Sequence, residues 1–306
     1  MGDEVGLRMN HSNHGWFATI TPVLIGIICT GCPAPKNAEE PVVRGVVNAA
    51  HQAKHREERS WTLPATNSQV LDIQTGNGGI KVYGQAEAKT AEVKAIIEVR
   101  APSSEQARAF AQQIKVTVES AGEVLRARRE YPKPPDRVNV SVSFEIAGPS
   151  GLDAMLRTKN GSIEARRLTG DLTVSTSNGS VSAQQLRGSI DAKTSNGSIE
   201  IRQAVLTESG RFETSNGRIA VALDDATAPL SAITANGAIE LRLPPGFSGR
   251  LDARTVNGRI TVRPDQSQLQ RNPRGTEVRG PLGAGSDKHP VQLRTSNGSI
   301  LLNIGK

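Results

Sequence analysis

The residues best suited to do chemistry in this sequence are carboxylates that recur at similar positions around a repeated motif. Glutamates stand four residues after the asparagine of the motif, and aspartates precede it at similar offsets. These residues are Glu164, Glu200, Glu240, Asp153, Asp191 and Asp252. Stacked into two acidic rows, such carboxylates could supply the acid and base that cleave a polysaccharide.

Charge pairing explains these carboxylates more simply than catalysis does. Arg202 and Arg242 each stand two residues beyond a glutamate, which in a strand places both side chains on one face. Opposite charges at this spacing pair on a solvated sheet. Sugar sites usually offer aromatic platforms, whereas residues 151–306 contain only Phe212 and Phe247. We therefore predict no catalytic residues and no enzyme, with a polysaccharide-active β-helix enzyme as the alternative.

Other common sites are not indicated. His51 and His55 have the spacing of one helical face, but they stand beside basic residues without further ligands nearby. The glycine-rich stretch at residues 76–79 lacks the phosphate-cradling pattern. The net charge of +7 would suit nucleic acid, but basic and acidic residues alternate throughout. We expect no metal, no cofactor and no nucleic-acid partner.

The elements that must position the carboxylates are copies of one motif, T-x-N-G-x-[IV]. From Asn160 onward the Asn-Gly pairs are spaced by 18, 18, 20, 20, 21 and 40 residues. Apolar and polar residues alternate before and after each Asn-Gly pair. This pattern predicts that each repeat unit consists of a strand, a corner and a second strand. The predicted structural corners are Asn77, Gly78, Asn160, Gly161, Asn178, Gly179, Asn196, Gly197, Asn216, Gly217, Asn236, Gly237, Asn257, Gly258, Asn297 and Gly298.

Two architectures fit such a unit. Asn-Gly is a strong hairpin signal and allows an antiparallel meander. A β-solenoid consists of coils of about 20 residues stacked on one another. It explains why the same residue types, and not merely residues of the same polarity, recur at each position of the unit. In stacked coils Thr lies on Thr, Asn on Asn and Ile on Ile, which favours ladders of like side chains. We predict an all-β fold with a β-solenoid, in which the corner Asn takes a left-handed conformation and the Gly a positive φ.

The N-terminus predicts export. Residues 1–32 contain an apolar run of signal-peptide length that ends at Cys29-Thr30-Gly31-Cys32. This ending resembles a bacterial lipobox, in which the cysteine after the cleavage site is acylated, although Cys29 stands where such motifs usually carry Leu. The resemblance implies lipidation of Cys32 and a membrane anchor.

The next two segments differ in pattern. Residues 33–60 are polar and charged without strand pattern, and predict a flexible tether. Residues 61–150 contain alternating segments typical of half-buried strands. Within them Ser103 and Gln106 have capping-box spacing ahead of a helical apolar stripe. We predict a β-rich N-terminal cap region with one short helix, followed by solenoid repeats over residues 151–306.

The spacing of 40 residues between the last two motifs marks an interruption. Residues 264–290 lack apolar alternation and are rich in Gly, Pro and Arg, which predicts a loop inserted into one coil. The chain ends on the apolar run 300–304. A terminal repeat needs a cap, so we expect self-association through an open C-terminal coil.

The repeated motif resembles that of the bacterial "putative adhesin" family of DUF4097/DUF4098 type. Members carry T-x-N-G-x-[IV] at a period of about 20 residues after an irregular β-rich part. The resemblance covers about residues 61–306 and implies a β-solenoid at the cell envelope, without catalytic residues to carry over. We expect an exported, lipid-anchored adhesin or scaffold, periplasmic or surface-facing, that binds an unknown envelope component, either a protein or a polysaccharide.

Overall fold

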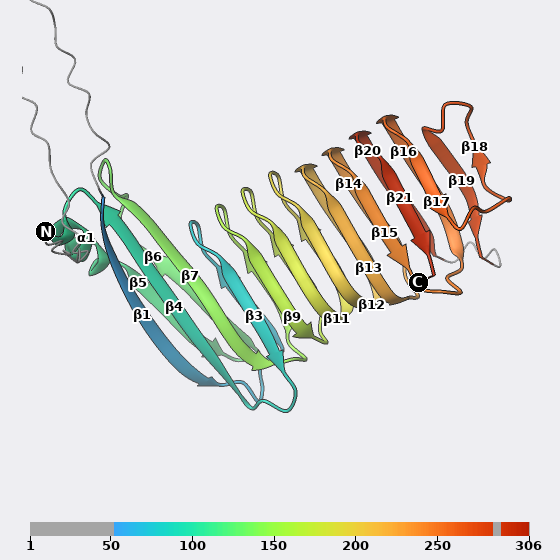
Figure 1. Ribbon diagram of the computed structural model, residues 1–306. Coiled ribbons are helices and arrows are strands. Elements are labelled where there is room, and N and C mark those ends of the chain that lie inside the picture. The colour runs from blue at the N-terminus through green and yellow to red at the C-terminus, as the bar shows by residue number, and fades with distance from the viewer. Residues whose placement is uncertain (1–51, 284–288, 306) are drawn as a thin grey trace, which may run out of the picture. The chain divides into compact units, whose positions relative to one another are not determined.

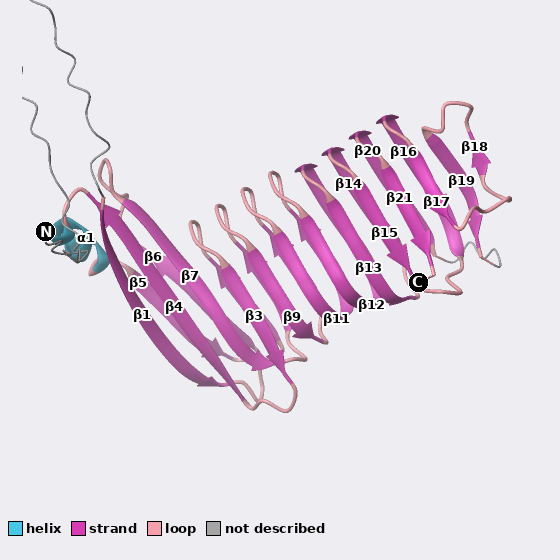
Figure 2. Ribbon diagram, viewed as in Figure 1, coloured by secondary structure: helices cyan, strands magenta, loops and turns pink. Residues whose placement is uncertain are grey.

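The computed structural model describes residues 52–283 and 289–305, which belong to one compact unit. The predicted signal peptide, Cys32 and the tether up to residue 51 lie outside the described residues. Figure 2 shows strands through nearly all of the described chain and one helix near one end. None of its helices has the length and apolar character needed to cross a membrane.

Each coil of the repeat has one strand before the Asn-Gly corner and one strand after it. The leading strands stack in parallel as sheet I, and the trailing strands stack in parallel as sheet II (Figure 1). Sheet I holds β2 (Val70–Gln74), β8 (Asp153–Arg157), β10 (Leu172–Ser175), β14 (Leu230–Asn236), β20 (Pro290–Asn297) and β16 (Gly249–Asn257). Sheet II holds β3 (Ile80–Gln85), β9 (Ile163–Leu168), β13 (Ile219–Ala226), β15 (Ile239–Leu243), β21 (Ile300–Ile304) and β17 (Ile260–Arg263). The long strands β11 (Val181–Lys193) and β12 (Ile199–Asn216) pass from sheet II into sheet I. The predicted β-solenoid is confirmed.

Identical side chains stack because the coils are in register. The apolar residue three places after each Asn, such as Ile199 or Ile219, is at most 4% exposed in all eight coils. The eight Asn side chains form one ladder in which each amide Nδ2 donates to the Oδ1 of the neighbouring coil at 2.6–2.9 Å. Seven of the eight buried Thr hydroxyls donate to the corner glycine carbonyl of a neighbouring coil, as Thr194 does to Gly179 at 2.9 Å, and Thr75 donates to the carbonyl of Val142 at 2.7 Å.

The reason for the corner glycine differs from our expectation. Of the eight, only Gly78 has a positive φ, and no corner Asn is left-handed. A Cβ on Gly197 would instead stand 2.1 Å from the carbonyl oxygen of Gly179 on the next coil. The same clash, at 2.0–2.1 Å, recurs at Gly161, Gly179 and the later corners. Glycine is therefore required by close approach of neighbouring backbones and not by turn conformation.

The coils do not stack in sequence order. Strand β20 pairs with β14 on one side and β16 on the other, and β21 lies likewise between β15 and β17. The last coil of the chain is thus inserted between the two coils that precede it, as Figure 1 shows. The expectation of an open C-terminal coil is wrong because both edges of that coil are already paired, so this coil offers no free edge for the expected self-association.

The N-terminal end of the solenoid is closed by the segment between its first two coils. Strand β6 (Val124–Glu130) pairs in parallel with β2, and strand β7 (Asn139–Pro149) pairs in parallel with β3. Antiparallel strands β5 (Lys115–Ala121) and β4 (Thr90–Ala101) follow outside them. Helix α1 (Ser104–Ala111), whose N-cap Ser103 accepts from Gln106 N at 3.2 Å, packs against β4. The solenoid therefore begins at β2, earlier than the predicted residue 151.

The predicted tether is too long at its C-terminal end. Strand β1 (Ala53–Pro64) pairs along its full length with β4 as an antiparallel edge strand. Its charged residues make cross-strand ion pairs, Lys54 with Glu98 at 2.7 Å and Glu58 with Lys94 at 2.6 Å. The high charge that indicated a tether is the charge of a protected sheet edge.

The described part of the predicted loop insertion, residues 264–283, contains regular secondary structure. It contains β18 (Gln270–Arg271) and β19 (Glu277–Leu282), and β19 pairs antiparallel with β16 at the edge of sheet I. Leu269 and Val278 are at most 7% exposed. The segment therefore caps the C-terminal end of the solenoid, which is a structural role the sequence pattern did not indicate.

Candidate functional site

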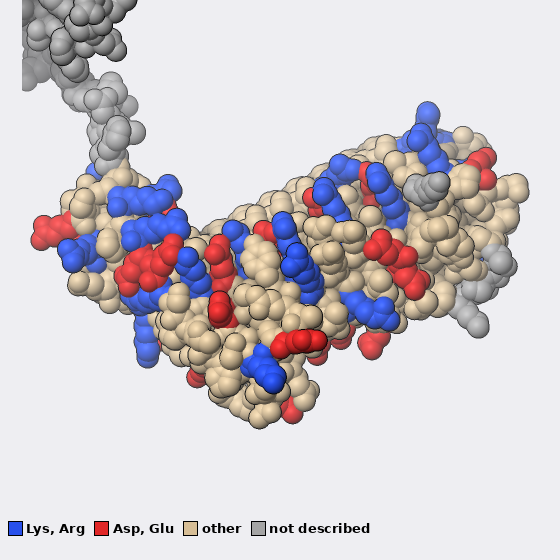
Figure 3. Space-filling view, turned by 60° about the horizontal axis from the view of Figure 1, so that its bottom comes forward, with Lys and Arg blue, Asp and Glu red and all other residues tan. Residues whose placement is uncertain are grey.

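The outward face of sheet II carries Glu-x-Arg pairs on alternate coils. Strands β9, β12 and β15 present Glu164–Arg166, Glu200–Arg202 and Glu240–Arg242, each joined by an ion pair of 2.5–2.9 Å. The strands between them carry small or uncharged residues, which are Ser182 and Gln184 on β11, and Ala220 and Ala222 on β13. Because coils are about 4.8 Å apart, the charged ridges repeat at about 10 Å. Figure 3 shows basic and acidic side chains close to one another on one face of the molecule, with uncharged surface between them.

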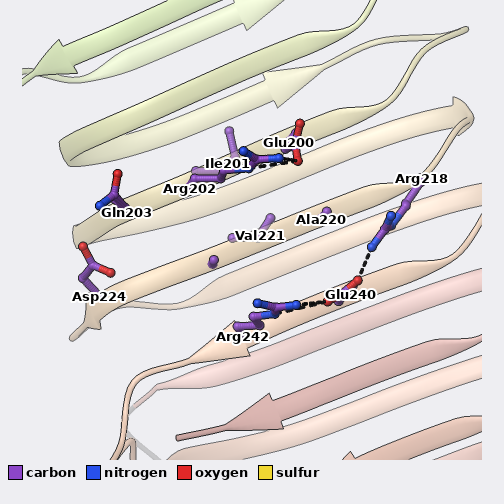
Figure 4. A pocket seen from close by; sticks show the side chains of 11 residues that line it. Glu200, Ile201, Arg202, Gln203, Arg218, Ala220, Val221, Asp224, Glu240 and Arg242 are labelled. Carbon is purple, nitrogen blue, oxygen red and sulfur yellow. Dashed lines mark hydrogen bonds and ion pairs between the residues drawn. The ribbon is translucent and has the colours of Figure 1, made fainter. Parts of the chain in front are cut away.

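A trough lies over β13, between two of these ridges. It has a volume of about 490 Å³, and its floor is formed by Ala220 and Ala222. Glu200 and Arg202 form one wall, and Glu240 and Arg242 form the other (Figure 4). The floor lies below the walls because two alanines stand where the neighbouring coils carry the longer side chains of glutamate and arginine.

Arginines surround one of the trough's carboxylates. Glu240 pairs with Arg242 on its own strand and with Arg218 at the corner before β13, as Figure 4 shows. Partial burial acts to raise the pKa of Glu240, but hydrogen bonds from Arg242 and Arg218 outweigh it and hold the pKa below its ordinary value. Glu240 therefore stays ionised at neutral pH.

This electrostatic arrangement suits binding better than acid–base catalysis. A glycosidase acid needs a raised pKa so that it can protonate the leaving group. Glu240 has the opposite shift, and Glu200 is held by two nitrogens of Arg202 at 2.5 and 3.0 Å. The described residues contain no group of three or more His, Cys, Asp or Glu side chains placed to hold a metal. The trough can offer hydrogen bonds and paired charges to a ligand lying along β13 between its two walls.

The two acidic rows suggested by the sequence do not form. Glu164, Glu200 and Glu240 share a row of sheet II, but each is two coils from the next and has its own arginine. Asp191 and Asp252 share a row of sheet I with other residue types between them, among them Arg211. Asp153 is outside that row, and its carboxylate accepts from the backbone N of Asp171 at 2.8 Å.

The predicted structural corners lie together along one edge of the solenoid as the exposed Asn ladder and the glycines beneath it. What sequence reasoning missed is the alternation of charged and small residues on sheet II. The signal was present in the letters after each corner, which read SIEAR, SVSAQ, SIEIR, RIAVA and AIELR. Comparing neighbouring coils in stacking order, and not only the shared motif, would have found the trough.

The chain matches one family model and several solved structures of low sequence identity. A family model described as Toastrack DUF4097 matches residues 151–303. A structure described as a "putative cell adhesion protein" from Clostridium sporogenes is 12% identical, with 82% of this chain and 100% of that chain covered and a TM-score of 0.38. A "putative adhesin" from Bacteroides fragilis is 13% identical, with 80% and 97% covered and a TM-score of 0.39. No curated protein matches the chain.

Proposed function

The chain belongs to the DUF4097 (Toastrack) family, and we propose that it is a non-enzymatic, adhesin-like protein of the cell envelope that binds a partner on sheet II. The observation that carries the proposal is the trough over β13 between charged ridges two coils apart. A parallel solenoid holds its outward rows at a fixed spacing, because every strand is hydrogen-bonded to its neighbours. Such a surface suits an extended envelope polymer or protein better than a small metabolite.

The floor of the trough gives the sharpest test of this binding surface. The double variant Ala220→Glu/Ala222→Arg copies the neighbouring Glu-x-Arg motif onto β13, so it fills the trough while the net charge is unchanged. The matched control Thr173→Glu/Ser175→Arg places the same pair on the outward face of β10 in sheet I. Both variants place charged side chains at outward strand positions beside like charges on the neighbouring strands, so urea denaturation of each variant checks that it is folded.

The assay is retention of the full chain on cell-envelope fractions and on a polysaccharide array, with turnover followed on any glycan retained. We expect the wild type and the sheet I control to be retained alike, and the filled-trough variant to lose retention by about tenfold or more. Equal retention of all three proteins would exclude the trough as the binding surface. Cleavage of a retained glycan would favour the alternative of a polysaccharide-active enzyme.

Membrane anchoring through Cys32 is a separate part of the proposal. It rests on the apolar run and the lipobox-like ending of residues 1–32. Metabolic labelling with a fatty-acid analogue should label the wild type and Cys29→Ser, and should fail to label Cys32→Ser. Labelling of Cys32→Ser, or a lack of labelling in all three proteins, would refute the lipid anchor. Neither result would bear on the proposed binding at the trough.

A further inference from the structure

A second charged hollow lies on sheet I, near the C-terminal end of the solenoid. Arg254 of β16 and Arg294 of β20 are direct partners in the parallel register of these strands. Their side chains are 43% and 45% exposed, so both guanidinium groups reach solvent. Like charges placed directly across neighbouring strands destabilise a sheet, so this placement calls for a compensating negative charge.

The surrounding carboxylates compensate only part of that charge. Arg254 pairs with Asp252 at 3.1 Å, whereas Arg279 of β19 lies 2.7 Å from Glu277 and 3.4 Å from Asp252. The shortest ion pair of Arg294 within the described chain is 3.9 Å long, to Asp252. Three arginines thus share two carboxylates, and the excess positive charge lies on Arg294.

The nearest partner of Arg294 is neutral. With the Gln292 amide oriented to satisfy both of its ends, its oxygen accepts from Nε and Nη2 of Arg294 at 3.1 and 2.8 Å. This contact fixes the direction of the guanidinium without neutralising it. An arginine held in place by a neutral amide is prepared to bind an oxyanion, since little side-chain freedom remains to be lost.

The space beside the two arginines is partly apolar. The hollow has a volume of about 350 Å³ and is also lined by Ile233, Val256, Thr276 and Ser296. Val256 is 69% exposed and is the one large hydrophobic residue classed as exposed in the described part of the chain. On the neighbouring coils its place is taken by Ser296 and Ala235. The hollow therefore combines two cations and hydroxyl groups with an apolar edge. It is also lined by Glu277, which lies 2.7 Å from Arg279 and 3.8 Å from Arg254.

We propose that this hollow binds a single oxyanion group, a carboxylate or a phosphate, that is part of a larger molecule. Arg254 and Arg294 hold the anionic oxygens through the Nη hydrogens that Asp252 and Gln292 leave available, because guanidinium groups bind planar or tetrahedral oxyanions with paired hydrogen bonds. Ile233 and Val256 contact the carbon skeleton beside the anion. An acidic sugar and a phosphorylated headgroup share this chemistry. The site lies on sheet I and does not depend on the trough of sheet II.

The test is calorimetric titration of the full chain with glucuronate and, separately, with glycerol phosphate, at an ionic strength held constant with KCl. Arg294→Gln removes the excess charge, and Arg211→Gln is the matched control on sheet I, where Arg211 is paired with Glu213 at 2.6 Å. We expect at least one of the two ligands to bind the wild type and the control alike, and to bind Arg294→Gln about tenfold or more weakly. The tighter of the two ligands identifies the source as an acidic sugar or a phosphate headgroup.

Denaturation without ligand shows whether the variant is folded. Because Arg294→Gln removes a like-charge contact, it should be at least as stable as the wild type, and any loss of binding then comes from the site itself. The proposal is overturned if neither ligand binds, if Arg294→Gln binds as tightly as the wild type, or if KCl alone produces the same effect.

Discussion

Replacing Gly197 by alanine tests why the repeat requires glycine at its corner. An added Cβ would stand 2.1 Å from the carbonyl oxygen of Gly179 and 2.6 Å from the carbonyl carbon. Carbon atoms in contact normally stand about 3.5–4.0 Å apart, so neighbouring coils would have to separate by more than 1 Å at this corner. The obstacle is backbone and cannot rotate away as a side chain could.

The cost follows from the contacts that such a separation breaks. Thr194 Oγ1 donates to the carbonyl of Gly179 at 2.9 Å, and Asn196 Nδ2 donates to Asn178 Oδ1 at 2.9 Å. Losing both hydrogen bonds costs about 2 kcal/mol, and forcing a methyl group into a packed site adds about 1–3 kcal/mol. The reduced freedom of the unfolded chain returns about 0.4–1 kcal/mol. We expect Gly197→Ala to lower the free energy of unfolding by about 2–4.5 kcal/mol.

The matched control is Gly151→Ala. A Cβ there would have Thr169 Oγ1 as its nearest neighbour at 3.9 Å, and Gly151 is not a positive-φ residue. This variant should be neutral or more stable by about 0.4–1 kcal/mol. The assay is urea denaturation of both variants, with amide hydrogen exchange at the corner, because repeat proteins can open locally before they unfold.

The reasoning has a clear point of failure. If Gly197→Ala unfolds within about 0.5 kcal/mol of Gly151→Ala, neighbouring corners are not in the close contact on which the calculation depends. Increased exchange at residues 176–200 alone, with global stability unchanged, would show instead that the coils open locally at little cost.

Three further predictions address other parts of the fold. Deleting residues 290–306 removes β20 and β21 from between their neighbours, so hydrogen exchange should show β16 and β17 unprotected while β8 to β13 stay protected; protection of β16 would contradict the inserted order. Thr194→Val keeps the shape of a side chain that is 2% exposed but removes its hydrogen bond, and urea denaturation should show a loss of about 1 kcal/mol, whereas no loss would mean that the hydroxyl contributes nothing. The hydrogen bond from Lys54 holds the pKa of Glu98 below its ordinary value, so the stabilisation by Glu98 is present above the unfolded pKa of about 4.5 and is lost as the pH falls through the lower folded pKa. Glu98→Gln should therefore cost about 0.5–1 kcal/mol at pH 7 and less at pH 3, in denaturation measured at both pH values, and a cost that does not change with pH would refute the ion pair.

The sequence by itself determined the coil and its register. Asn196 and Thr194 recur with their neighbours at the same positions in every coil because each amide and hydroxyl must find its counterpart on the next coil. The sequence also contains the cause of the trough over β13, because Ala220 and Ala222 stand at the positions where the neighbouring coils carry a glutamate and an arginine. It could be found only by comparing coils that stack on one another.

Only the tertiary structure decided which coils are neighbours. The coil that contains Asn236 offers the same Thr, Asn, Gly and Ile ladder to the coil of Asn257 as to that of Asn297, and it pairs with the second. A repeat that matches every coil to every other leaves their order unspecified, so the inserted C-terminal coil could not be predicted from the motif. The same insertion brings Arg254 and Arg294 side by side, although 40 residues separate them in the sequence. The charged hollow of sheet I therefore exists only because of the stacking order.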